Sequence, residues 1–158
     1  MLNPSSWVKP SAESLKFNVD GAVVGGLGRA GIGGILRNSG NESLILFSRA
    51  AGSTDATSAE LNAILEAVNL FRKSKWVHSF KLLLETDCSL CVQWLERPSS
   101  TPLCFKTLIE ECLEACAGLR WSIEAVSRSA NAMADKLAKS GISRGVPLVW
   151  MSQKHQTL

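Results

Sequence analysis

Hydrophobic and polar residues alternate with a period of two over residues 15–20, and this alternation predicts a β-strand. Its apolar face would carry Leu15, Phe17 and Val19, and its polar face would carry Lys16, Asn18 and Asp20. Glycines follow at Gly21, Gly25, Gly26 and Gly28. Because glycine favours turns, we expect these glycines to turn the chain after the first strand.

Two more short apolar runs follow this first strand. Residues 30–37 predict a second strand, although three glycines weaken it, and residues 44–47 predict a third. The polar residues 38–41 between them are typical of a tight turn. Three strands joined by short turns predict an antiparallel meander.

The apolar spacing then changes to that of a helix. The residues Leu61, Ile64, Leu65, Val68 and Phe71 recur at three and four positions, as on one face of an α-helix. Thr57 and Glu60 have the spacing of a capping box, which predicts that this helix begins at Thr57.

The rest of the chain alternates between strand and helix patterns. Strands are expected at 81–86 and 121–126. Helices are expected at 89–95, which stops near Pro98, at 105–117, and at 130–140, with Gly141 as the C-terminal stop. A strand–helix–strand unit implies a parallel, right-handed crossover. The sequence therefore predicts an α/β fold with one five-stranded mixed sheet, three strands antiparallel and then two parallel, and helices on both faces.

The length of 158 residues favours a single domain. We expect a leader or linker at 1–13, the domain at 14–142 and a C-terminal tail at 143–158. No apolar run approaches the roughly 20 residues of a membrane helix, and no signal peptide is evident, so we expect no membrane partner. The net charge of +3 is compatible with nucleic acid without indicating it.

Five cysteines without a signal peptide indicate reduced thiols in an intracellular protein, whose compartment the sequence leaves open. Cys88 and Cys91 have one zinc-ligand spacing, but no second pair matches it, and His78 and His155 are isolated. We therefore interpret the cysteines as small apolar residues on helix faces rather than as zinc ligands.

Four acidic residues occupy positions that packing does not require. Asp20 and Asp87 follow two strands expected to lie parallel, Glu60 begins the long helix, and Asp135 lies among alanines in the last helix. Each has an ordinary structural role available: a turn for Asp20, the capping box for Glu60, a helix cap for Asp87 and a surface charge for Asp135. Parallel strands, however, bring their carboxyl ends to one sheet edge, where α/β proteins bind ligands.

A cluster of carboxylates repels itself unless a cation neutralises it. Oxygen ligands of this kind select Mg²⁺ or Mn²⁺. Two such ions can stabilise the attacking and leaving oxygens of a phosphodiester displacement. Hydrolysis of a phosphodiester is therefore the chemistry that Asp20, Glu60, Asp87 and Asp135 would suit.

Five segments carry a resemblance to a known family: LKFNVDGAV at 15–23, AGIGGILRNS at 30–39, AELNA at 59–63, ETD at 85–87 and RSANAMADKLA at 128–138. Together they resemble the ribonuclease H family, and more narrowly the plant ribonuclease H-like domains related to retrotransposon reverse transcriptases. The resemblance covers about residues 7–142 and implies a ribonuclease H-like fold. Each motif is weak alone, whereas their order along the chain is specific.

The resemblance implies an endoribonuclease that cuts the RNA strand of RNA–DNA hybrids with two Mg²⁺ ions, for which Mn²⁺ could substitute. Asp20 would bridge both ions, Glu60 and Asp87 would complete one site, and Asp135 the other. Substrate contacts are expected from the backbone of Gly21 and Ala22, and from Asn131 and Arg128 near the last helix. No small-molecule cofactor is expected, and we expect a monomer.

The sequence also departs from the family pattern. Active members often carry a histidine before the last helix, where this chain has Ala125, and residues 96–106 lack the basic, Trp-containing segment of bacterial members. The alternative is therefore a catalytically weak or inactive ribonuclease H-like module that binds nucleic acid or protein. A related DNA exonuclease is disfavoured, because its acidic residue two positions after the first aspartate is Ala22 here.

Arg72, Lys73 and Lys75 form a basic cluster at the end of the long helix. They either complement the helix dipole or contact a substrate.

Overall fold

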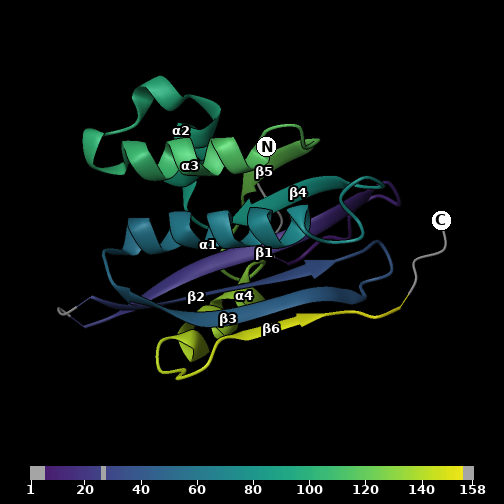
Figure 1. The fold of residues 1–158 in the computed structure, drawn as a ribbon, viewed down its shortest axis with the longest axis horizontal. Coiled ribbons are helices and arrows are strands. Elements are labelled where there is room, and N and C mark those ends of the chain that lie inside the picture. The colour runs from purple at the N-terminus through teal and green to yellow at the C-terminus, as the bar shows by residue number, and fades with distance from the viewer. Residues whose placement is uncertain (1–5, 26–27, 155–158) are drawn as a thin grey trace.

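A computed structural model describes residues 6–25 and 28–154 of the chain. Gly26 and His155, and the outer ends of the expected leader and tail, lie outside these described residues. The structure comprises six strands, four α-helices and two short 3₁₀ turns within the described residues (Figure 1). In chain order the elements are β1 (Ser14–Val24), β2 (Arg29–Arg37), β3 (Ser43–Ser53), α1 (Ala56–Arg72), β4 (Lys81–Thr86), α2 (Ser89–Glu96), η1 (Pro98–Ser100), η2 (Leu103–Phe105), α3 (Lys106–Cys116), β5 (Trp121–Ala125), α4 (Ala132–Gly141) and β6 (Leu148–Met151).

The strands form one mixed sheet in the order β5-β4-β1-β2-β3-β6. β1, β2 and β3 pair antiparallel, while β4 runs parallel to both β1 and β5. This confirms the α/β class and the predicted change from antiparallel to parallel pairing. The predicted number of five strands is wrong, because β6, within the segment expected as a tail, pairs with β3 at the sheet edge.

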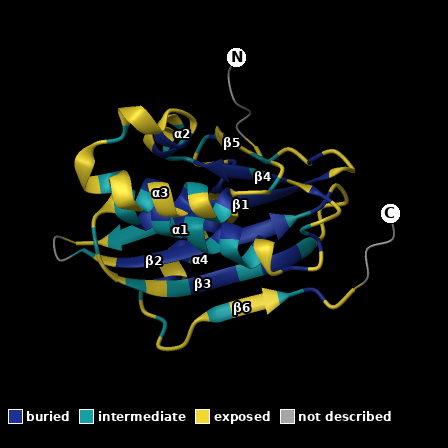
Figure 2. Cartoon of the chain, turned by 45° about the horizontal axis from the view of Figure 1, so that its top comes forward, coloured by how far each residue is buried: buried dark blue, intermediate teal, exposed yellow. Residues whose placement is uncertain are grey.

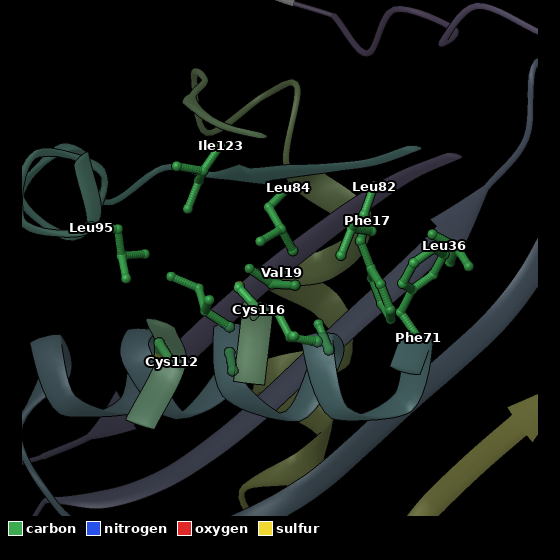
Figure 3. Close-up of a cluster of buried hydrophobic side chains, with 14 of the residues drawn as sticks. Phe17, Val19, Leu36, Phe71, Leu82, Leu84, Leu95, Cys112, Cys116 and Ile123 are labelled. Atoms are coloured by element: carbon green, nitrogen blue, oxygen red, sulfur yellow. The ribbon is translucent and has the colours of Figure 1, made fainter. Parts of the chain in front are cut away.

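Helices cover both faces of the sheet. α1 packs on one face, with α3 against α1, and α4 packs on the opposite face over β1, β2 and β3 (Figure 1). The alternation of β1 was predicted correctly: Leu15, Phe17 and Val19 are fully buried toward α1. Figure 3 shows how side chains from the sheet and the helices meet in this core, including Cys112 and Cys116. With Cys91 also fully buried, these three cysteines pack as small apolar residues, as predicted, whereas Cys104 is exposed.

The chain turns at Gly25 and Gly28, as predicted, but not at Gly21. Gly21 lies inside β1, which continues to Val24, and the chain reverses only beyond it, with Gly25 and Gly28 at positive φ. A strand interior usually disfavours glycine, but here a Cβ on Gly21 would lie 2.4 Å from the Ala59 carbonyl carbon of α1. Gly21 is therefore required for the close approach of helix and strand.

Two glycines of β2, Gly31 and Gly33, have the same role on the opposite face of the sheet. A Cβ on Gly33 would lie 2.4 Å from the backbone nitrogen of Ala138, and one on Gly31 would meet the Ala138 carbonyl, so both allow α4 to approach. Gly141 was predicted to stop this helix, but it is the last residue of α4 and does not have a positive φ. A Cβ there would lie 2.7 Å from the Arg49 carbonyl oxygen of β3.

The segment expected as a leader packs on the sheet where the structure describes it. The Trp7 ring lies 4.0 Å from the Arg37 guanidinium carbon, and Lys16 Nζ donates a hydrogen bond to the Val8 carbonyl. Burial is greatest in the central strands, whereas β6 and the outer helix surfaces are exposed (Figure 2). Among the described residues, no helix has the length and apolar character needed to span a bilayer.

Candidate active site

Three carboxylates from separate elements converge beside the end of β4. One oxygen each from Asp20, Glu60 and Asp87 lies within 4.8 Å of the other two. The parallel register between β1 and β4 explains the first contact: Asn18 faces Glu85, so two residues further on Asp20 faces Asp87. Asp20 is therefore in the middle of β1, not at its C-terminal end as predicted, and only β4 ends here.

Glu60 reaches this point from α1 because of the close contact at Gly21. The Gly21 N–H donates a hydrogen bond to Glu60 Oε1, and Thr86 Oγ1 donates to Oε2 over 3.4 Å. The predicted capping box is wrong: Asp55 caps α1, accepting a 2.7 Å hydrogen bond from the Ser58 N–H. Glu60 is thus free of a capping role and turns into the site.

Asp135 approaches from the opposite face of the sheet, in the first turn of α4. It lies outside the three-carboxylate group, and its Oδ2 is 3.0 Å from Lys139 Nζ. All four predicted acidic residues nevertheless line one cavity of about 450 Å³. The remaining lining residues are Gly21, Ala22, Val23, Ala56, Thr57, Cys88, Arg128 and Lys139.

The inner carboxylates are costly to ionise together. Burial is the largest influence, and it raises the pKa of both Asp20 and Glu60 well above the range of an exposed acid. Their mutual hydrogen bond lowers the pKa of Asp20 and raises that of Glu60, so Glu60 is the one that retains the proton. The charge of Asp87 raises the pKa of both.

The pKa of Asp135 is shifted in the opposite direction. Its partial burial would raise its pKa, but hydrogen bonds with Lys139 and Asp20, together with the positive charges of Lys139 and Arg128, hold the pKa below its ordinary value. The site therefore places the buried pair Asp20 and Glu60, whose pKa values are raised, beside Asp135, whose pKa is lowered. A divalent cation is the kind of ligand that such a set of oxygens attracts.

The predicted substrate-contacting residues differ in their placement. Arg128 has a side chain that is 95% exposed and lies 3.7 Å from Asp87 at the cavity margin. Gly21 and Ala22 line the cavity, but the Gly21 N–H is bonded to Glu60 in this structure. Asn131 is 1% exposed and does not line the cavity.

The cavity residues that were not predicted as site residues are Val23, Ala56, Thr57, Cys88 and Lys139. The signal for Lys139 was present in the sequence, since it follows Asp135 at the i,i+4 spacing of helical ion pairs. Cys88 caps α2, with its sulfur accepting the Cys91 N–H.

Two residues of the basic cluster at the end of α1 have partners within the protein. Arg72 donates to the Ala115 and Ala117 carbonyls at the end of α3, and Lys75 donates to the Ser152 carbonyl next to β6.

Solved structures of ribonucleases H have a similar fold. The LC11 ribonuclease H1, isolated from compost by a metagenomic approach, has 21% identity and a TM-score of 0.75, covering 82% of this chain and 96% of that one. Ribonuclease H1 from the archaeon Halobacterium salinarum has 23% identity and a TM-score of 0.75, covering 82% and 97%. The LC11 enzyme in complex with an RNA/DNA hybrid matches at 20% identity with a TM-score of 0.74, covering 82% and 96%.

These similarities define a protein with the ribonuclease H fold. Residues 18–141, most of the chain, match the family described as reverse transcriptase-like, and the chain belongs to that family. Among curated proteins none matches it.

Proposed function

We propose that this protein hydrolyses the RNA strand of RNA–DNA hybrids, with divalent metal ions held by Asp20, Glu60, Asp87 and Asp135. The observation that carries the proposal is the convergence of Asp20, Glu60 and Asp87 within 4.8 Å at the cavity that Asp135 also lines. The solved LC11 ribonuclease H1 complex, which has the same fold, contains an RNA/DNA hybrid.

The donor set fits a metal centre. Asp20 and Glu60 are buried, and burial, which penalises the charged form, is the main reason why the pKa of each is raised. The nearest described cations, Arg128 and Lys139, pair with the outer acids Asp87 and Asp135 and leave the inner pair without a cation. Carboxylate oxygens prefer Mg²⁺ and Mn²⁺, and either ion would offset the repulsion.

When bound, such ions supply Lewis-acid chemistry at the scissile phosphate. The residues of the chain would supply the rest of the site. Asp20 is at the centre of the site and would hold ions together with Glu60 and Asp87 on one side and with Asp135 on the other. Arg128 is exposed at the margin beside Asp87, where its guanidinium group can contact a phosphate of the substrate.

A catalytically weak or inactive binding module is the second candidate, and one observation favours it. The position of the family histidine is Ala125, at the end of β5. His78 is the sole histidine among the described residues, and it lies in a separate cavity with Arg72 and Gly118. No described imidazole is therefore available at the site to move a proton near neutral pH.

Cleavage of a uniformly labelled RNA–DNA hybrid tests the proposal. With Mg²⁺, we expect the RNA strand to be cut into short products, at a rate that excess chelator abolishes and added Mg²⁺ restores. Equal cleavage in chelator would contradict the metal mechanism. Binding of the hybrid with no cleavage in Mg²⁺ or Mn²⁺ would instead favour the binding module.

A further inference from the structure

A network of buried polar side chains lies on the α4 face of the sheet, next to the acidic cavity. Asn18 is fully buried at its centre, in β1 two residues before Asp20. Its Nδ2 donates hydrogen bonds to Glu85 Oε1 over 3.0 Å and to Asn131 Oδ1 over 3.1 Å, and its Oδ1 accepts from Arg37 over 3.2 Å. The amide therefore uses both of its donors and its acceptor.

The network is tied to the rest of the sheet by charged groups. Lys16 Nζ lies 3.2 Å from Glu85 Oε2, and both side chains are less than 10% exposed. The Arg37 guanidinium group lies under the Trp7 ring. Asn18 thus has a position fixed from two sides, by Glu85 of β4 and by Arg37 of β2. A buried amide with every partner satisfied has little freedom to move.

Asn131 connects Asn18 to the last helix, α4. Besides accepting from Asn18, its Nδ2 donates to the Val19 carbonyl over 2.8 Å. Its backbone carbonyl accepts the Asp135 N–H over 3.1 Å, and its own N–H donates to the carbonyls of Ser127 and Arg128. Asn131 therefore connects β1, at the residues directly before Asp20, to both Asp135 and the loop carrying Arg128.

We propose that Asn18 is a positioning residue that, through Asn131, sets the distance of Asp135 and Arg128 from Asp20. An apolar residue at this place would leave Glu85, Asn131 and Arg37 without the hydrogen bonds that they make with Asn18. The two amides instead give a directional link across the sheet face, which apolar packing does not provide. This inference rests on the proposed function, because it assigns the network to the same metal and substrate site.

The test compares Asn18→Ala with Ser48→Ala, a control at a strand residue that contacts the same helix, α4. Ser48 is fully buried in β3, and its Oγ donates to the Leu137 carbonyl of α4 over 2.6 Å. Each variant removes a buried polar link between the sheet and α4, but Ser48 holds the half of the helix away from Asn131. Asn18→Ser is the reserve variant if Asn18→Ala does not fold.

Three readouts separate positioning from stability. Amide hydrogen exchange at Asp135 should accelerate at least about tenfold in Asn18→Ala but not in Ser48→Ala. Apparent Mn²⁺ affinity should fall about tenfold, the lower end of the loss seen when groups that orient metal ligands are removed. The kcat on hybrid should fall while KM changes little. In a double-mutant cycle, adding Asn18→Ala to Asn131→Ala should lower kcat no further, because both act along one link.

The outcomes distinguish this inference from the proposed function. If Asn18→Ala accelerates exchange at Asp135 and weakens Mn²⁺ binding, while neither it nor the parent cleaves hybrid, the positioning role stands and the proposed activity fails. If the parent cleaves hybrid and Asn18→Ala matches it in kcat, Mn²⁺ affinity and Asp135 exchange, the activity stands. In that case Asn18 contributes only to stability, and the inference is overturned.

Discussion

At the scale of single residues, Asp20 is a carboxylate in an unusual place, the interior of a central strand. It is 4% exposed, and burial raises its pKa to about 7. An acid that packing alone required would be replaceable by its neutral amide, because the two side chains have the same shape. An acid that holds cations is not replaceable in this way, and the comparison separates the two roles.

Asp20→Asn should abolish cleavage of hybrid while leaving the fold intact. In the absence of metal it should raise the free energy of unfolding by on the order of 1 kcal/mol, because one ionisable group is removed from a repulsive cluster. It should also reduce the increase in Tm that Mg²⁺ causes in the parent. Thermal and urea unfolding measure these effects. Glu124→Gln, at an exposed acid of β5, is the matched control; cleavage by Asp20→Asn at the parent rate would exclude the metal role.

Ala125 is the second informative residue. It ends β5 and faces Thr86 of β4, whose hydroxyl group bonds Glu60. Ala125→His should raise turnover a few-fold without changing substrate preference, because general acid–base help of ~10²–10⁴-fold requires a supporting shell that a grafted side chain lacks. Steady-state and single-turnover rates measure the change. Ala125→Gln, of similar size but without a titrating group, should give no increase; an equal gain would assign the effect to shape.

At the scale of elements, the position of α1 depends on its first turn. Asp55 accepts hydrogen bonds from the Ser58 N–H and hydroxyl group. Slight burial raises the pKa of Asp55, but these bonds outweigh it and hold the pKa below its ordinary value. Because the pKa of Asp55 is lower in the folded than in the unfolded state, these hydrogen bonds stabilise the fold fully at a pH above the unfolded pKa. This stabilisation is lost as the pH falls through the folded pKa.

Asp55→Ala should therefore lower the free energy of unfolding at pH 7 by about 1 kcal/mol, the usual cost of losing an N-cap, whereas Asp55→Asn should cost less. As the pH falls to about 3, below the ordinary pKa of an aspartate, the difference between the parent and Asp55→Asn should shrink. Urea denaturation at both pH values measures this. A difference that grows on acidification would contradict the assigned cap.

The contact between α4 and β2 is the second feature at this scale. Gly33→Ala should lower the free energy of unfolding by about 1–3 kcal/mol, because its Cβ would lie 2.4 Å from the Ala138 nitrogen and would push α4 outward. It should also slow cleavage, since α4 carries Asp135. Gly145→Ala, where a Cβ would meet no atom within 4 Å, is the control. Equal stability and activity for the two variants would show that α4 tolerates displacement.

At the scale of the whole molecule, residues from both sides of the sheet line the acidic cavity: α1 packs on one face of the sheet and α4 on the other. Given the proposed function, we expect cleavage of RNA–DNA hybrid to exceed that of single-stranded RNA, double-stranded RNA and double-stranded DNA. Contacts to 2′-hydroxyl groups on one strand disfavour pure DNA, and a groove shape suited to a DNA partner strand disfavours pure RNA. Rates on the four substrates in one buffer measure this. Comparable rates on all four would indicate an unselective nuclease.

Most of the order of strands and helices, and all four acidic residues, could be predicted from the sequence. Period-two alternation around Phe17 and helical spacing around Ile64 are local patterns, and each reports which side chains must be buried together. Asp20, Glu60, Asp87 and Asp135 could be assembled because they occur at motif positions of a known family. The structure brings them to one cavity.

Other features depended on contacts between distant residues. Asp55–Ser58 and Thr57–Glu60 have the same spacing, and only the contact of α1 with Gly21 decides that Glu60 turns to Asp20. In the sequence Gly21 resembles a turn residue, Gly33 a weak point of its strand and Gly141 a helix stop, but each lies against the backbone of another element.

The sequence by itself determined the α/β class, the order of most elements and the acidic residues of the candidate site. The spacing of apolar residues and the chemistry of the side chains are local properties of each segment. Only the tertiary structure decided the sixth strand, the cap of α1 and the buried link from Asn18 to Asn131. Residues 18 and 131 lie far apart in the chain. Their hydrogen bond exists because β1 and α4 pack face to face, and no local pattern specifies that partner.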